Sequence, residues 1–176
     1  MPASRNVTGT TAVIIRPLFN LPVTFETVSS RRTRSSSGRP HKPLTKALLL
    51  PMDRASASGH SLSKHLALVA CRAGHGNSHL VNELMRAVYL SWFLQRAGYG
   101  ACPTEHFKNA ECAVEATLRQ ARESGRWQLP PDSVEDFETL LALYDGQLAR
   151  APLHAVLAAE QRLRTFLAGT ASSPIP

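Results

Sequence analysis

Cysteines, aromatic residues and long apolar runs are all scarce in this chain of 176 residues. Three cysteines are too few for a disulfide scaffold, and they indicate a reducing, cytoplasmic setting. Aromatic residues make up 6% and hydrophobic residues 43%, a balance that favours helices packed through Leu, Ala and Val over a β-sandwich. No stretch approaches the ~20 apolar residues that cross a bilayer. We therefore expect no contact with a membrane.

Acidic residues are nearly absent from the first third of the chain. Residues 1–51 carry eight Lys and Arg against one Glu, whereas residues 52–176 carry twelve basic and twelve acidic residues. The net charge of +7 therefore lies entirely in the N-terminal segment. Residues 29–40, SSRRTRSSSGRP, cannot bury enough apolar surface to offset the entropy of ordering them. We predict a disordered basic arm over residues 1–60, much of which a translation start at Met52 would remove.

Helical periodicity begins at residue 61, and it predicts an all-α domain over residues 61–169. A short leading helix is expected over residues 61–72, where Leu62, His65, Leu66 and Val69 recur at helical spacing. Four long helices are expected to follow, over residues 77–97, over residues 103–124, from Asp132, and from Pro152 to just before Gly169. Short connections between long amphipathic helices predict an antiparallel up-down bundle. Residues 170–176 are expected to fray.

Two of these helices have distinctive local signals. Residues 87–94, AVYLSWFL, are apolar almost all round, which is typical of the central helix of a bundle. The helix from Asp132 has Glu135 three residues later, in the positions of a capping box.

Metal binding is a hypothesis that rests on five side chains. Thiolate and imidazole suit zinc, and the spacing Cys-x3-His occurs twice. Closely spaced cysteine pairs are missing, however, and glycines interrupt the first group. We therefore expect no bound metal, with one buried cysteine, a second cysteine in a loop and surface histidines as the simpler interpretation. The five residues are Cys71, His75, His79, Cys102 and His106.

Catalysis has weak support in the sequence. Cys102 and His106 could form a thiol nucleophile with its base, but no third orienting residue is evident. The acidic residues after Asp132 have the spacing of a solvated helix face. The sequence has no phosphate-binding loop, dinucleotide fingerprint or Gly-x-Ser-x-Gly motif. We predict a protein that is not an enzyme, with no catalytic residue, cofactor or small-molecule substrate.

Binding to DNA has two candidate carriers. Basic side chains of the arm could neutralise phosphates without reading bases. The passage from residue 62 through AGHGN into the second helix is similar to a helix–turn–helix, whose second helix would offer polar residues near its start. The arm candidates are Arg31, Arg32, Arg34, Arg39 and Lys42, and the helix candidates are Asn77, Ser78, His79, Asn82 and Arg86.

The passage LVACRAGHGNSHLVNELM, residues 68–85, resembles the start of the DNA-binding segment of Fis-type regulators. Gly76 and Asn77 match its glycine turn, and Leu84 falls on an apolar position. More broadly, LSKHLALVACR, VYLSWFL and the terminal helix pair resemble short proteobacterial proteins labelled as Fis-family regulators. This resemblance implies a small bacterial transcriptional regulator. The Fis-type pattern ends where a basic recognition helix should continue, since residues 85–90 are largely apolar.

Two function classes therefore remain open. One is a small cytoplasmic regulator that touches DNA through the arm and the polar start of the second helix. The other is a helical module that binds a protein partner or forms a homodimer, without DNA.

Overall fold

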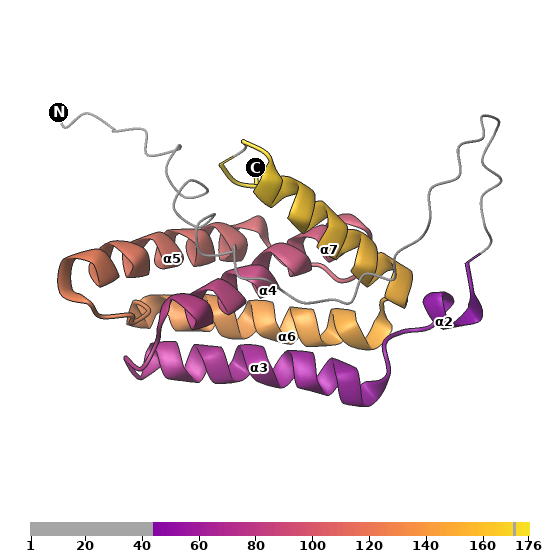
Figure 1. The fold of residues 1–176 in the computed structure, drawn as a ribbon, viewed down its shortest axis with the longest axis horizontal. Coiled ribbons are helices and arrows are strands. Elements are labelled where there is room, and N and C mark those ends of the chain that lie inside the picture. The colour runs from indigo at the N-terminus through magenta and orange to yellow at the C-terminus, as the bar shows by residue number, and fades with distance from the viewer. Residues whose placement is uncertain (1–43, 171) are drawn as a thin grey trace, which may run out of the picture.

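The computed structural model describes residues 44–170 and 172–176, and that part of the chain is built from helices (Figure 1). The predicted all-α fold is confirmed, because extended pairing within the described residues is limited to one isolated bridge between Pro51 and Pro152. The elements are α2 (Lys46–Leu49), α3 (Arg54–Arg72), α4 (Ser78–Arg96), α5 (Thr104–Ser124), the 3-10 helix η2 (Pro131–Ser133), α6 (Val134–Arg150) and α7 (Leu153–Ala168).

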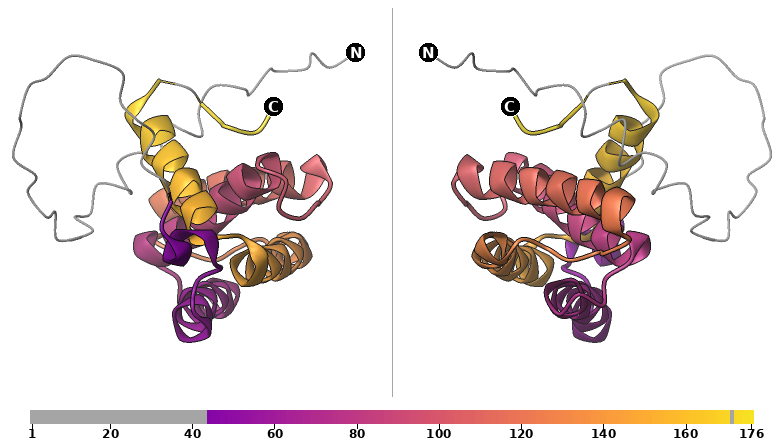
Figure 2. Two further views of the ribbon diagram at one scale, coloured as in Figure 1. Left: turned by 90° about the vertical axis from the view of Figure 1, so that its right-hand side faces the viewer. Right: turned by 90° about the vertical axis from the view of Figure 1, so that its left-hand side faces the viewer.

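Helices α3 to α6 form a bundle whose successive members run in opposite directions (Figure 1). Helix α4 is central, since it packs against α3, α5, α6 and α7. Helix α7 lies across α4 on the side away from α3, and short α2 contacts α7. Helix α3 contacts α4 and α6 only on one side and forms the outer edge of the described structure (Figure 2).

The core is densest around α4. Eleven of its nineteen residues are buried, including Tyr89, Trp92 and Leu94, as the apolar run predicted. Edge-to-face contacts join Trp92 to Phe107 of α5, at 5.2 Å between ring centroids, and Tyr89 to Phe166 of α7, at 5.4 Å. Such aromatic pairs add to the burial of their large side chains, so α4 holds the other helices together.

Most predicted helix boundaries are confirmed by their local chemistry. The side chain of Asn77 accepts a hydrogen bond from the Leu80 N–H, 2.9 Å away, and caps α4. Pro103 precedes α5, and Gly125 ends that helix with φ of +72°, a left-handed conformation that glycine adopts without strain. Pro152 precedes α7.

The leading helix is longer than predicted. It begins at Arg54, where the side chain of Asp53 accepts a hydrogen bond from the Ser56 N–H, 2.9 Å away. Ser61, expected to cap it, therefore lies inside α3, and the boundary placed at residue 60 is wrong. The small residues at 55–59, ASASG, hid the first turns, because they carry little hydrophobic periodicity. The 19-residue helix is a full member of the bundle.

The capping box predicted at Asp132 is absent. The chain instead makes the 3-10 turn η2, and Ser133, at the N-cap of α6, makes no side-chain capping bond to the helix. The Ser133 hydroxyl donates to the Pro130 carbonyl, 2.7 Å away, and so closes the turn. Two prolines in succession favour this tight turn, and it replaces the expected cap.

The predicted fraying of residues 170–176 is also wrong for residues 172–176. Ile175 is buried, and the Trp92 indole N–H donates to the Pro174 carbonyl, 2.9 Å away. The Ser173 hydroxyl donates to the carboxylate of Glu111, at 2.7 Å, and so fixes the tail to α5. A buried indole needs an acceptor, and the tail supplies it.

Candidate functional site

Helix α3 is apolar on two opposite faces. One face packs into the bundle and buries Ala67, Leu68 and Cys71. The other carries Leu62, Leu66 and Val69, which are 59%, 58% and 63% exposed. These are larger apolar side chains than most on the packed face. Exposed apolar residues that lie in a continuous row indicate an interaction surface, whereas single scattered ones do not.

The exposed row continues along the whole helix with heptad spacing. Successive steps of four, three, four, three and four residues join its members, and all six are exposed. This is the spacing of positions a and d in a coiled coil, where a second helix packs along the row. We call this row the α3 seam; it consists of Ala55, Gly59, Leu62, Leu66, Val69 and Ala73.

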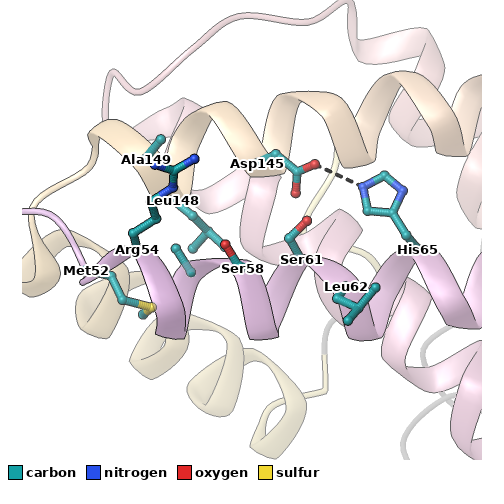
Figure 3. A pocket seen from close by; sticks show the side chains of 10 residues that line it. Met52, Arg54, Ser58, Ser61, Leu62, His65, Asp145, Leu148 and Ala149 are labelled. Atoms are coloured by element: carbon teal, nitrogen blue, oxygen red, sulfur yellow. Dashed lines mark hydrogen bonds and ion pairs between the residues drawn. The ribbon is translucent and has the colours of Figure 1, made fainter.

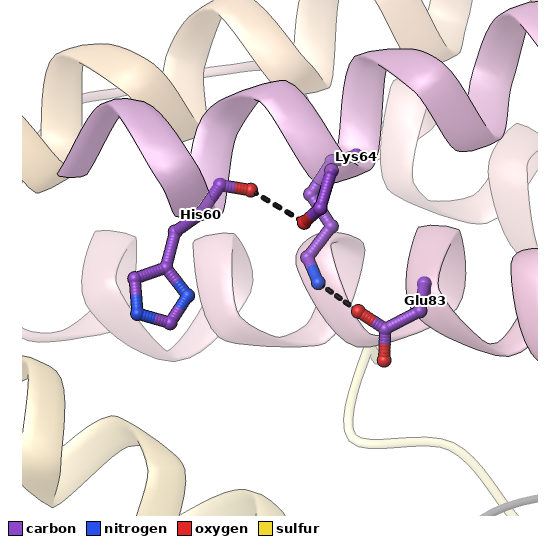
Figure 4. A network of polar contacts seen from close by, with 4 residues as sticks. His60, Lys64 and Glu83 are labelled. Atoms are coloured by element: carbon purple, nitrogen blue, oxygen red, sulfur yellow. Dashed lines mark hydrogen bonds and ion pairs between the residues drawn. The ribbon is translucent and has the colours of Figure 1, made fainter. Parts of the chain in front are cut away.

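The orientation of α3 depends on a buried ion pair. Lys64 lies on the packed face, its side chain only 6% exposed, and its ammonium pairs with the carboxylate of Glu83 on α4 (Figure 4). A buried ammonium is stable only with a partner that compensates its lost hydration. Rotation of α3 to bury the seam would pull Lys64 away from Glu83. The ion pair therefore keeps the seam outward.

A groove of about 620 Å³ runs beside the seam, between α3 and α6 (Figure 3). Leu62 belongs to both the seam and the groove, so a helix lying on the seam would reach the edge of this groove. Its wall combines apolar side chains with two serine hydroxyls and the charged or polar side chains of Arg54, His65 and Asp145. The lining residues are Met52, Arg54, Ala57, Ser58, Ser61, Leu62, His65, Asp145, Leu148 and Ala149.

One polar contact lies at an end of the groove. His65 Nε2 lies 2.9 Å from Asp145 Oδ2, and the two side chains face each other between α3 and α6 (Figure 3). The second carboxylate oxygen, Asp145 Oδ1, is buried and has no hydrogen-bond partner within the described residues. His65 and Asp145 thus join α3 to α6, as Lys64 and Glu83 join α3 to α4.

The predicted DNA-contacting residues of the second helix do not form one exposed face. Asn77 is exposed but caps α4, and His79 is exposed beside it. Ser78 and Arg86 are half-buried. Asn82 is buried, which is inconsistent with a contact to a base and corrects the prediction at that position.

A recognition helix must insert into the major groove, whereas α4 is enclosed by four helices. The five arm candidates, at positions 31, 32, 34, 39 and 42, lie outside the described residues.

The candidate metal ligands lie at two ends of the bundle. Cys71, His75 and His79 are near the start of α4, whereas Cys102 and His106 follow its end. A helix of 19 residues is about 28 Å long, so the two groups cannot share one ion. Within the described residues, no three His, Cys, Asp or Glu side chains are placed to hold a metal.

The Cys102 and His106 pair gains a third residue that the sequence analysis missed. His106 Nδ1 lies 2.6 Å from Asp136 Oδ1 at the start of α6. Burial and the nearby Asp136 carboxylate raise the pKa of the Cys102 thiol, however. A nucleophilic cysteine needs a lowered pKa. No hydrogen bond joins Cys102 Sγ to His106 in the described part of the chain, so the thiol is not activated.

Comparisons of the chain with protein-family models, with curated proteins and with solved structures gave no match. None of the described helices combines the length and apolar character that crossing a bilayer requires.

Some of this site had a signal in the sequence. The row Leu62, Leu66 and Val69 was visible as helical spacing, and its 4-3 alternation, extended to Ala55 and Ala73, is the sign of a helix-binding surface. The partners of Lys64 and His65 had no such signal, since Glu83 and Asp145 are distant in sequence.

Proposed function

We propose that this chain is a non-enzymatic helical interaction module, which binds a helix of a protein partner along the α3 seam. One observation carries the proposal: a complete a/d row of apolar residues points away from the core over the length of α3. Such a row lowers solubility in water unless something covers it. The row is exposed although the core beside it is well packed, and this supports a role in docking.

The structural details of α3 support this role over a purely structural one. The bundle is already complete on the packed face of α3, where Lys64 and Leu68 are buried. The ion pair to α4 and the His65 contact to α6 hold the helix in a defined orientation. A rigid, preorganised surface loses less conformational entropy on binding than a flexible one does.

The regulator implied by the resemblance to Fis-labelled proteins fits this proposal in a modified form. We propose a small cytoplasmic bacterial regulator that acts through protein contacts, in which any attraction to DNA comes from the basic arm. The burial of α4 argues against a recognition helix. The raised pKa of the Cys102 thiol supports the non-enzymatic assignment, because a nucleophilic cysteine needs a lowered one.

Photo-crosslinking in living cells tests this function. The photoreactive residue p-benzoylphenylalanine replaces Leu66 in the full chain, and the matched control carries it at Leu157, an exposed leucine on α7. We expect a discrete adduct at position 66 and none at position 157. Mass spectrometry should assign the cross-linked peptide of the partner to a helix. Adding Leu62→Glu should abolish the adduct. If position 66 gives no adduct, or one that Leu62→Glu leaves intact, the proposed function is wrong.

A further inference from the structure

We infer that the helix bound by the α3 seam is α3 of a second copy of this chain, packed antiparallel to the first. This inference rests on the proposed function and names its partner. The argument comes from the order of residue sizes along the seam, from the charges beside it and from the position of α3 at the edge of the molecule.

Residue sizes along the seam are nearly symmetric about its centre. Leu62 and Leu66 stand in the middle, Gly59 and Val69 lie outside them, and the alanines at 55 and 73 form the ends. In an antiparallel pair centred between the two leucines, Leu62 of one copy faces Leu66 of the other. Gly59 then faces Val69, so the smallest residue receives the branched side chain. The seam is therefore complementary to itself when its direction is reversed.

Parallel packing matches the seam less well. It would place Gly59 against Gly59 and leave a gap beside the central leucines, because neither copy offers a side chain there. Gaps in an apolar interface lose contacts and lower its stability. Antiparallel packing also opposes the two helix dipoles, which is the favourable arrangement. Both effects favour the antiparallel pair.

The residues that flank the seam carry almost no charge, so they do not favour a partner of opposite charge. Positions e and g of a coiled coil usually carry Glu and Lys, which determine the choice of partner. Here one flank is Ser56, Ser63 and Ala70, and the other is Ser58, His65 and Arg72.

Two such surfaces meet without repulsion, because the only permanent charge is Arg72 at one end. In the antiparallel pair Arg72 lies near Ser58 of the second copy and within about one helical turn of that copy's Asp53, a favourable arrangement.

The position of α3 allows two copies to approach. Helix α3 forms the outer edge of the described structure in both views of Figure 2. A symmetric dimer uses the same surface on both subunits, as this geometry requires. The row from residue 55 to residue 73 is about 27 Å long, five turns of helix on each copy.

The oligomeric state of the full chain is the first test. Analytical ultracentrifugation of the wild type should give twice the chain mass of 19.2 kDa. Leu66→Glu should give the monomer mass, because a carboxylate would face Leu62 of the second copy in an apolar layer. The matched control Leu157→Glu, an exposed leucine on α7, should stay dimeric. A monomeric wild type, or a Leu66→Glu variant that remains dimeric, would overturn the inference.

Thiol cross-linking tests the direction of the pair. In a Cys102→Ser, Cys112→Ser background, one preparation carries Leu62→Cys and a second, larger tagged one carries Leu66→Cys. A short thiol-bridging reagent should link the two preparations to each other when they are mixed, and should link neither to itself. Linkage of each preparation to itself would show a parallel pair and overturn the geometry.

The two proposals fail in different ways. If the wild type is a monomer and the photoadduct at position 66 maps to another protein, the second-copy inference is wrong and the interaction function stands. If the adduct maps to another segment of the same chain, both are wrong. A dimer abolished by Leu66→Glu, with the adduct mapping to α3, supports both.

Discussion

The buried ammonium of Lys64 on α3 pairs with the carboxylate of Glu83 on α4, and this contact fixes which face of α3 meets the core. The side chain of Lys64 is 6% exposed and that of Glu83 is 24% exposed, so the cation is the more deeply buried partner. Loss of the anion would leave a buried charge without compensation.

Glu83→Gln should therefore lower the free energy of unfolding by about 3 kcal/mol, as expected for a broken buried pair. Lys64→Met should cost less, because Glu83 can regain water. The double variant Lys64→Met, Glu83→Gln should recover most of the loss, since it leaves no buried charge. Chemical denaturation of the four proteins gives the coupling energy through a double-mutant cycle.

An exposed ion pair, which joins α3 to α6, serves as the control for this cycle. Arg72 and Glu138 are 3.9 Å apart, with side chains 67% and 59% exposed. Glu138→Gln should change the stability by less than about 1 kcal/mol, because water screens exposed pairs. Equal effects of Glu83→Gln and Glu138→Gln would contradict the structural role given to Lys64.

Gly76 is a second position where a small change should be costly. A Cβ at Gly76 would lie 2.2 Å from the Trp127 carbonyl oxygen and 3.1 Å from Cys71 Sγ. Backbone cannot move aside as a flexible side chain can, so Gly76→Ala should destabilise the fold by about 1–3 kcal/mol or more. Gly146→Ala is the matched control, because its Cβ would meet only the flexible end of Arg150. Thermal unfolding should show a large loss for the first variant and a small gain for the second.

How far the sequence predicts this molecule depends on where the determining contact lies. Asn77, Pro103, Gly125 and Pro152 act within a few residues, and the helices that they bound are as predicted. The buried face of α3 could not be predicted, because the helix has two apolar faces and periodicity alone does not indicate which one is buried. The answer depends on Glu83, nineteen residues beyond Lys64.

The tail shows the same limit. Nothing local predicts that Ile175 is buried, since the tail needs the acceptor Glu111 and the indole of Trp92 to fix it. The row that we propose as the docking surface was only partly recognised in the sequence. Its spacing could be read, but its exposure could not.

Glu111 makes the stability of the fold depend on pH. Burial raises the pKa of this carboxyl above its ordinary value of 4.5, although Ser173 and Tyr89 donate hydrogen bonds to it. The folded chain therefore holds this proton more tightly than the unfolded chain does. Its contribution to stability is largest below pH 4.5 and falls as the pH rises through the raised folded pKa.

Glu111→Gln should remove this dependence while the amide oxygen still accepts hydrogen bonds from Tyr89 and Ser173. The melting temperature of the variant, minus that of the wild type, should rise as the pH is increased from below 4.5 to neutrality, and then stay level. Differential scanning calorimetry over that range measures it. A difference that is constant with pH, or that falls, would show that burial does not control this group.

Binding to DNA should depend on the arm and not on α4. Neutralising the five arm candidates in the full chain (Arg31, Arg32, Arg34, Arg39 and Lys42, each to Gln) should abolish binding to duplex DNA at moderate salt. Binding by the unmodified chain should weaken steeply with salt and show no sequence preference, because the arm is attracted only to the phosphates. The matched variant His79→Ala, Arg86→Ala changes the predicted recognition positions and should leave the affinity unchanged. Fluorescence anisotropy over a salt series measures both. Sequence-specific binding that this second variant abolishes would contradict the enclosed position of α4 and restore the recognition-helix hypothesis.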